Sequence, residues 1–146
     1  MFSYDLSPFY GGNGGEFFED DLTGVSQLVG VNIYAGNWIN ALQAVWLMVD
    51  GSTRAGAWRG NPGDGEQSGF VLQPGEFITQ VRCTWGDFVH TLSVTTSLNK
   101  VYGPFGQEEG PEWSTITAPV YGFAGRSGNY LDAVAFYTLA PSGGQN

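Results

Sequence analysis

The stretch GNYLDAV, Gly128 to Val134, is one of three similar segments in this chain of 146 residues. The other two are GNWINAL, Gly36 to Leu42, and GDFVHTL, Gly86 to Leu92. Each starts with glycine and Asn or Asp, continues with an aromatic and an aliphatic residue, and then has one polar residue that differs: Asp132, Asn40 or His90. Such repetition predicts a structural unit that occurs three times and buries its apolar face against its copies.

The residues around these segments alternate as strand residues do. In FITQVRCTW, residues 77–85, one face of an extended chain carries Phe77, Val81, Cys83 and Trp85, and the other carries Gln80, Arg82 and Thr84. The runs at 41–49 and 132–139 are apolar on both faces, which is typical of strands covered on both sides. No window of helical length has apolar residues at i, i+3 and i+4. The sequence therefore predicts an all-β fold.

Length, charge and cysteine content limit the class of protein. We expect residues 1–146 to form a single domain with a frayed tail at about 141–146. The net charge of −9 disfavours nucleic acid as a partner, and no apolar stretch is long enough for membrane insertion. The N-terminus shows no signal peptide, and Cys83 is the only cysteine. These features favour a soluble protein that is cytoplasmic or secreted by a non-classical route.

Three glycine-rich turns alternate with the three repeated segments. They are GGNGG at Gly11, GNPGDG at Gly60 and GQEEG at Gly106. The second and third turns can lie beside the segments at Gly36 and Gly86, which leaves GGNGG as the partner of the segment at Gly128. The N-terminal and C-terminal strands must then pair in one sheet, which closes an approximately threefold arrangement around a common axis.

Four motifs in this order make the resemblance to a known family specific. They are GGNGGEFFED, LQPGEFI, NKVYGPFG and GFAGRSGNYLDAVAFY, and the chain resembles the jacalin-related lectins from about Tyr10 to Leu139. The resemblance implies a β-prism I fold of three four-stranded Greek-key sheets with pseudo-threefold symmetry. It also implies calcium-independent sugar binding at one end of the prism, no metal or other cofactor, no enzyme activity, and a homodimer or higher homo-oligomer.

In that family the sugar lies between the glycine-rich first loop and the GxxxD loop. On this chain the resemblance gives a first site from Gly15, Asn129, Tyr130, Leu131 and Asp132. Asp132 would accept hydrogen bonds from two sugar hydroxyls, while backbone N–H groups would donate from the other side. Galactose binders in the family resemble a form cut before the glycine equivalent to Gly15. The uncut GGNGG therefore favours partners that are mannose- or glucose-containing oligosaccharides or glycoproteins.

The other two repeats predict weaker sites on the same scaffold. Asn40 has one acceptor and no charge, so a second, weaker site is expected from Gly36, Asn37, Trp38, Asn40, Gly60 and Asn61. His90 is bulkier and has at most one acceptor, so a third site would be the weakest or empty, with Gly86, Asp87, Phe88 and His90.

Two other functions fit parts of the sequence. A protein-interaction module with weak or lost sugar binding is the main alternative, because two of the three segments lack the acid. A glycoside hydrolase fits less well, because it needs two carboxylates and only Asp132 lies in a pocket motif. Alone, the segment at Gly128 could also be a turn in which Asp132 caps its own backbone. His90 and Cys83 are the only soft metal ligands, which argues against a zinc site.

Overall fold

The computed structural model describes residues 3–139, which form fourteen strands and, within that range, no helix. Accordingly, no helix in the described residues is long and apolar enough to cross a membrane. The frayed tail expected at 141–146 lies outside the described residues. The all-β prediction is confirmed.

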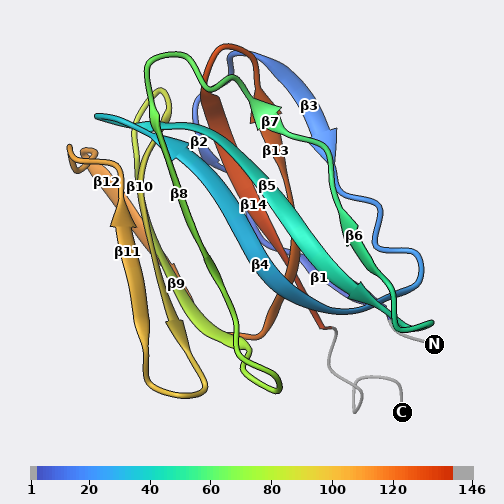
Figure 1. Ribbon diagram of the computed structural model, residues 1–146. Coiled ribbons are helices and arrows are strands. Elements are labelled where there is room, and N and C mark those ends of the chain that lie inside the picture. The colour runs from blue at the N-terminus through green and yellow to red at the C-terminus, as the bar shows by residue number, and fades with distance from the viewer. Residues whose placement is uncertain (1–2, 140–146) are drawn as a thin grey trace.

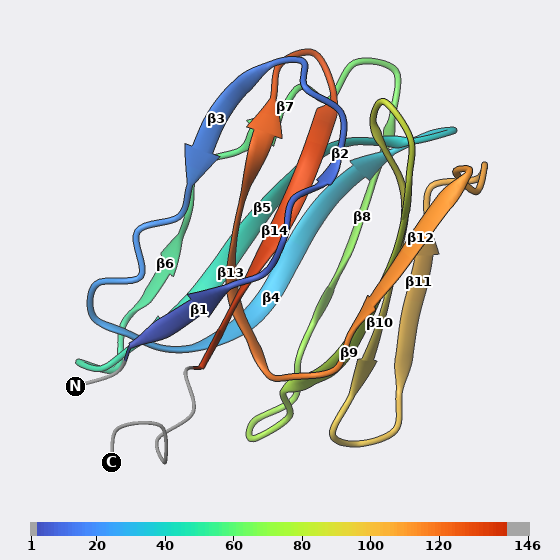
Figure 2. The ribbon, with the colours of Figure 1, turned by 180° about the vertical axis from the view of Figure 1, so that it is seen from behind.

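The first sheet joins the two ends of the chain (Figures 1 and 2). Its strand order is β1-β14-β13-β3, and the short β2 also pairs with β14. Tyr4 pairs with Leu139, and Glu16 pairs with Ser127, so the predicted pairing of the terminal strands is confirmed. The strands are β1 (Tyr4–Leu6), β2 (Tyr10–Gly11), β3 (Glu16–Glu19), β13 (Val120–Ser127) and β14 (Leu131–Leu139).

The second and third sheets have the same strand arrangement. Their orders are β6-β5-β4-β8, with the short β7 paired to β5, and β11-β10-β9-β12. The second contains β4 (Val25–Ala35), β5 (Ile39–Met48), β6 (Thr53–Ala55), β7 (Arg59–Gly60) and β8 (Glu66–Val71). The third contains β9 (Ile78–Trp85), β10 (Val89–Thr96), β11 (Val101–Phe105) and β12 (Glu112–Ile116).

Each sheet is a Greek key, in which the fourth strand lies beside the first. In the first sheet the order of units is β13, β14, β1 and β3, because the motif continues from the C-terminal strands to the N-terminal ones. The prediction of three Greek-key sheets is confirmed. The prediction of four strands in each was too simple, because β2 and β7 give two of the sheets a fifth, short strand.

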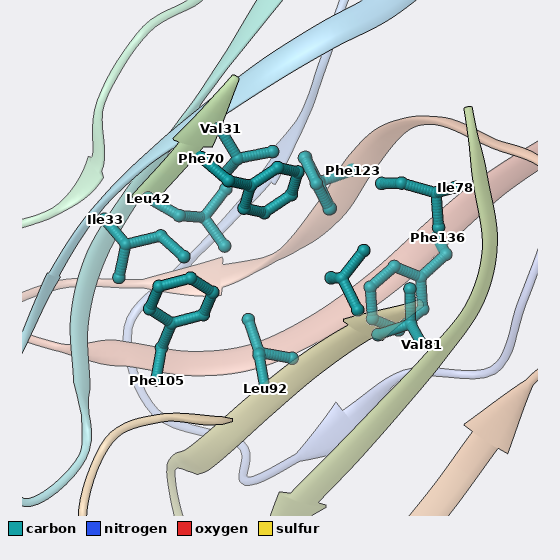
Figure 3. A pocket seen from close by; sticks show the side chains of 11 residues that line it. Val31, Ile33, Leu42, Phe70, Ile78, Val81, Leu92, Phe105, Phe123 and Phe136 are labelled. Carbon is teal, nitrogen blue, oxygen red and sulfur yellow. The ribbon is translucent and has the colours of Figure 1, made fainter. Parts of the chain in front are cut away.

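The three sheets surround one apolar core. Side chains from all three sheets converge in the interior, where they leave a cavity of about 20 Å³ (Figure 3). A cavity of that size could hold one water molecule only if polar groups lined it, and its lining is apolar. The interior therefore stabilises the prism and is not a ligand site.

Strand β9 shows where simple alternation fails. Phe77, expected on the core side, is 46% exposed, while its neighbour Ile78 is buried. A register shift between Thr95 and Thr96 on the paired strand β10 reverses the faces at this point. Thr84, expected on the outer face, is also buried, because its hydroxyl bonds to Thr91 and accepts from the N–H of Gly110. Cys83 lies in the core as expected.

Candidate functional site

The three repeated segments form the same turn at the same end of the prism. Each joins two neighbouring strands of one sheet, β4 to β5, β9 to β10 or β13 to β14, at the upper end in Figure 1. In each turn the N–H of the glycine donates to the carbonyl oxygen two residues later, at 3.0 Å. The three donor and acceptor pairs are Gly36 to Trp38, Gly86 to Phe88, and Gly128 to Tyr130.

The aromatic residues of the three turns meet one another. Ring centroids lie 5.0 Å apart between Trp38 and Phe88, 5.7 Å between Trp38 and Tyr130, and 5.3 Å between Phe88 and Tyr130. Aromatic pairs at these separations are favourable beyond the area that they bury. The aromatic position of the repeat therefore joins the three turns into one rigid end of the prism. We call this group of Trp38, Phe88 and Tyr130 the aromatic cluster.

The glycine-rich first loop covers the carboxylate of Asp132. The N–H of Gly12 donates to the carbonyl oxygen of Asp132 at 2.9 Å. A Cβ atom on Gly14 would lie 2.7 Å from Oδ2 of Asp132, and one on Gly15 would lie 2.6 Å from Oδ1. Gly15 also has a φ of 71°, which side chains disfavour. Only glycine therefore lets the backbone approach this carboxylate so closely.

The two loops that meet at this carboxylate contain backbone N–H groups without a partner among the turn and loop hydrogen bonds of the described residues. None of the turn and loop hydrogen bonds within residues 3–139 uses the N–H of Gly15, Asn129 or Tyr130 as its donor. Three backbone donors and one carboxylate thus come together from sequence positions more than a hundred residues apart. The structure brings together all five residues of the first predicted site, with Leu131 buried beneath it.

Asp132 is more enclosed than its sequence context suggested. It belongs to strand β14 and is only 6% exposed, whereas the motif alone suggested an acid at the tip of a loop with ready access to solvent. Burial raises the pKa of Asp132, and the positive charge of Arg126 and the backbone N–H of Asp132 itself oppose that rise. The carboxylate is partly stripped of water, which strengthens any hydrogen bond that a ligand hydroxyl donates to it.

At the second turn, Asn40 is used to hold the neighbouring loop. Asn40 is 3% exposed, and its Nδ2 donates to the carbonyl oxygen of Pro62 at 3.1 Å. A Cβ atom on Gly60 would lie 2.2 Å from the carbonyl oxygen of Asn40, so GNPGDG is the partner loop, as expected. The amide that was expected to face a ligand is therefore already bonded within the protein.

Two cavities lie outside Asn40. One of about 310 Å³ is lined by Gly36, Asn37, Trp38, Asn40, Asp64, Gln107 and Tyr130. The other, of about 480 Å³, is lined by Asn40, Asn61, Gly63, Asp64, Asn129 and Tyr130. Asp64 and Gln107 were not among the site residues predicted from the sequence. Asp64 stands in the GNPGDG turn that had already been matched to Asn40, so its position was the available signal.

The third turn is held by the GQEEG loop. Nδ1 of His90 donates to the carbonyl oxygen of Glu108 at 3.2 Å, and the His90 ring lies 5.1 Å from the ring of Trp38. The N–H groups of Gln107 and Glu108 both donate to the carbonyl oxygen of Asn37 at 3.0 Å. Gly86 and Asp87 complete this turn beside Phe88, and the contacts of His90 are those of a structural residue.

Acidic side chains do not gather into a metal site. Within residues 3–139, no group of three or more His, Cys, Asp and Glu side chains could hold a metal ion.

Comparison with known proteins gives a family match over most of the chain. Residues 7–137 match the family model of the jacalin-like lectin domain. The chain is 32% identical to a mannose/glucose-specific lectin from Parkia pendula over 92% of its own length, but spans only about a third of that protein. It is 30% identical to the jacalin-related lectin Calsepa from Calystegia sepium, covering 90% of this chain and 93% of Calsepa.

A solved structure shows the same fold. A mannose binding jacalin related lectin from Ananas comosus has a TM-score of 0.82 and 28% identity, covering 94% of this chain and 98% of that one. The matched proteins are all described as lectins, so the glycoside hydrolase hypothesis is set aside. With this match over nearly its whole described length, the chain belongs to the jacalin-like lectin domain family and has its β-prism fold.

Proposed function

We propose that this protein binds mannose or glucose units of glycans, without calcium, between Gly15 and Asp132. The observation that carries the proposal is the close approach of Gly14 and Gly15 to the Asp132 carboxylate, with backbone donors beside it. A pyranose ring presents neighbouring hydroxyl groups that can donate to the two carboxylate oxygens and accept from the N–H groups. No metal is needed for these contacts.

The choice of sugar rests on two supports. The Parkia pendula relative is described as mannose/glucose-specific, and the Ananas comosus structure as mannose binding. The GGNGG loop is also continuous with β3, so Gly15 offers a peptide N–H and not a charged amino terminus. A site with a few net hydrogen bonds of about 1 kcal/mol each suits a monosaccharide dissociation constant near about 1 mM.

Useful affinity for a glycoprotein would require several copies of the site. We propose that residues 1–146 act as one lectin domain that assembles as a homodimer or a higher homo-oligomer. Phe9, between β1 and β2, stacks on Phe17 of β3 with ring centroids 6.1 Å apart, and Phe17 remains 55% exposed. An exposed aromatic pair of this kind suits a surface that another copy covers.

A glycan array, followed by calorimetric titration with methyl α-mannoside, methyl α-glucoside and methyl α-galactoside, tests the proposal. Mannoside and glucoside should bind, galactoside should not, and a chelator should change nothing. Loss of binding in chelator, or equal binding of galactoside, would contradict the calcium independence or the choice of sugar, respectively.

A protein-interaction module remains the second candidate, and one observation favours it. The side chains of Asn40 and His90 are bonded to carbonyl oxygens of their own partner loops, so two of the three turns serve structure. If the folded protein binds no glycan on an array, this function is favoured over the lectin function.

A further inference from the structure

The two cavities outside Asn40 meet at shared residues. Asn40, Asp64 and Tyr130 line both of them. Their volumes, about 310 and 480 Å³, fall in the range of about 300–1,000 Å³ that is usual for ligand pockets. The larger cavity also reaches Asn129, which belongs to the turn of Asp132. It therefore lies between the first site and the second turn.

Asp64 changes the chemistry of this region. In the first site, the acid is the last residue of the turn, Asp132, and the opposing loop supplies backbone. At the second turn the arrangement is reversed, because Asn40 is bonded to Pro62 while the opposing loop carries an exposed carboxylate at Asp64. The carboxylate is therefore on the strand in the first site and on the opposing loop at the second turn.

The side chains around the larger cavity suit a neutral, hydroxyl-rich ligand. Asp64 offers two charged acceptors, Asn61 and Asn129 offer amides that both donate and accept, and Tyr130 adds an aromatic ring. The ring of Tyr130 is held by Trp38 and Phe88 in the aromatic cluster, so this wall is already in place before a ligand binds. A ligand would lose little free energy in ordering it.

We propose that this cavity binds the second residue of an oligosaccharide whose terminal mannose or glucose lies at Asp132, and that Asp64 is its principal acceptor. The proposal rests on the proposed lectin function, because Asn129 and Tyr130 are shared between the two positions. That sharing favours a linked residue over an independent monosaccharide.

Calorimetric titration with methyl α-mannoside and with mannobioses of different linkage tests the proposal. In the wild-type protein, at least one mannobiose should bind about tenfold more tightly than methyl mannoside, with one ligand per chain at this end. A tenfold gain in affinity is at the lower end of what one hydrogen bond to a charged group contributes. In Asp64→Asn, which keeps the shape of the side chain, the ratio of the two affinities should fall to near one.

The control variant is Glu108→Gln. It removes the same charge from the same end of the prism, where the Glu108 N–H bonds to Asn37, but Glu108 lines neither cavity. The tenfold ratio should survive in this variant, which separates a contact with Asp64 from a general effect of charge.

The outcomes distinguish the two proposals. Failure of wild-type protein to bind methyl mannoside would contradict the lectin function itself. Binding of methyl mannoside together with a mannobiose preference that Asp64→Asn leaves intact would overturn only the role of Asp64. If wild-type protein binds two equivalents of methyl mannoside and Asp64→Asn binds only one, the cavity is an independent monosaccharide site. That result would overturn the proposal that it binds the second residue of a linked oligosaccharide.

Discussion

Nη2 of Arg126 donates a hydrogen bond to the carbonyl oxygen of Gly15 at 2.8 Å, across 111 positions of sequence. Nε of the same side chain donates to the carbonyl oxygen of Gly14 at 2.9 Å. The carbonyl groups of Gly14 and Gly15 are therefore occupied, so these two residues face a ligand with their N–H groups free within the described residues. The guanidinium thus sets both the position and the polarity of the loop over Asp132.

Arg126→Lys should weaken sugar binding without unfolding the protein. Lysine keeps the charge but lacks the planar fork that holds two carbonyl oxygens at once. With one of two hydrogen bonds lost, at about 1 kcal/mol, we expect the affinity for methyl mannoside to fall about fivefold. Titration calorimetry measures the affinity, and circular dichroism checks the fold. An unchanged affinity would mean that the loop keeps its position without Arg126.

Asp132→Asn should abolish measurable binding of methyl mannoside. It removes the charge from two acceptor contacts, and a site near the millimolar range has little affinity to lose. Stability at neutral pH should stay equal or rise slightly, because burial raises the pKa of Asp132 and so its ionised form disfavours folding. As the pH falls through the folded-state pKa towards 3.8, the wild-type protein should regain that difference. Urea unfolding at several pH values measures it, and a wild-type advantage at pH 7 would contradict the sign.

For Asn40→Asp, the sequence and the structure lead to opposite expectations. From the sequence alone, a charged acceptor at this position should strengthen a second sugar site. In the structure, Asn40 donates to Pro62, so an aspartate would place two acceptors against each other in a buried position. We expect a loss of about 1–3 kcal/mol in unfolding free energy and no second mannose equivalent. A stable Asn40→Asp variant that binds a second equivalent of mannose would instead support the expectation from the sequence.

Phe88→Ala should loosen the aromatic cluster and weaken sugar binding at a distance. The ring of Phe88 contacts both Trp38 and Tyr130, and Tyr130 belongs to the turn of the proposed sugar site. We expect a loss of about 2 kcal/mol in stability and a several-fold loss in mannoside affinity. Phe77→Ala is the matched control, because Phe77 lies near Ser26 and Pro119, away from the turns. An equal loss of affinity in both variants would argue against transmission through the cluster.

Glu76 should give the protein an acid-sensitive stability of opposite sign to Asp132. Hydrogen bonds from the Thr96 hydroxyl and then the Gln73 N–H lower the pKa of Glu76, while burial opposes them. A lowered folded-state pKa adds stability above the ordinary value of 4.5, and that stability is lost as the pH falls through the folded-state value. Glu76→Gln should therefore be less stable at pH 7 and depend less on pH below 4.5. Thermal unfolding between pH 3 and pH 7 measures this, and parallel curves for the two proteins would refute it.

The repeat in the sequence predicted most of the fold because turn chemistry is local. Glycine, an aromatic and one polar residue specify the same turn wherever they occur, so the three turns and their partner loops could be matched in pairs. Pairing of the first and last strands followed from the one turn that was left over. Phe77 could not be placed in this way, because the register shift that exposes it depends on the neighbouring strand.

The candidate site was predicted by residue but not by environment. Gly15, Asn129, Tyr130 and Asp132 do meet, yet nothing in GNYLD shows that the carboxylate is enclosed or that Arg126 fixes the opposite loop. Both facts depend on contacts between β13, β14 and the N-terminal loop, which are far apart in the sequence. Asp64 was not predicted either. Its proposed role as an acceptor follows from the hydrogen bond between Asn40 and Pro62, which only the structure shows.

Pairing of β14 with β1 and β2, and of β13 with β3, has a consequence for how the protein is made. The N-terminal strands emerge first and have no partner until the last residues of the first sheet have been synthesised. During that interval the other two sheets can pair locally, whereas β1 and β3 wait as exposed edges. A nascent chain that stops before Leu131 would carry Gly15 but lack Asp132. With the proposed sugar site between Gly15 and Asp132, immobilised mannose should retain chains that include Asp132 and release chains that stop before Leu131.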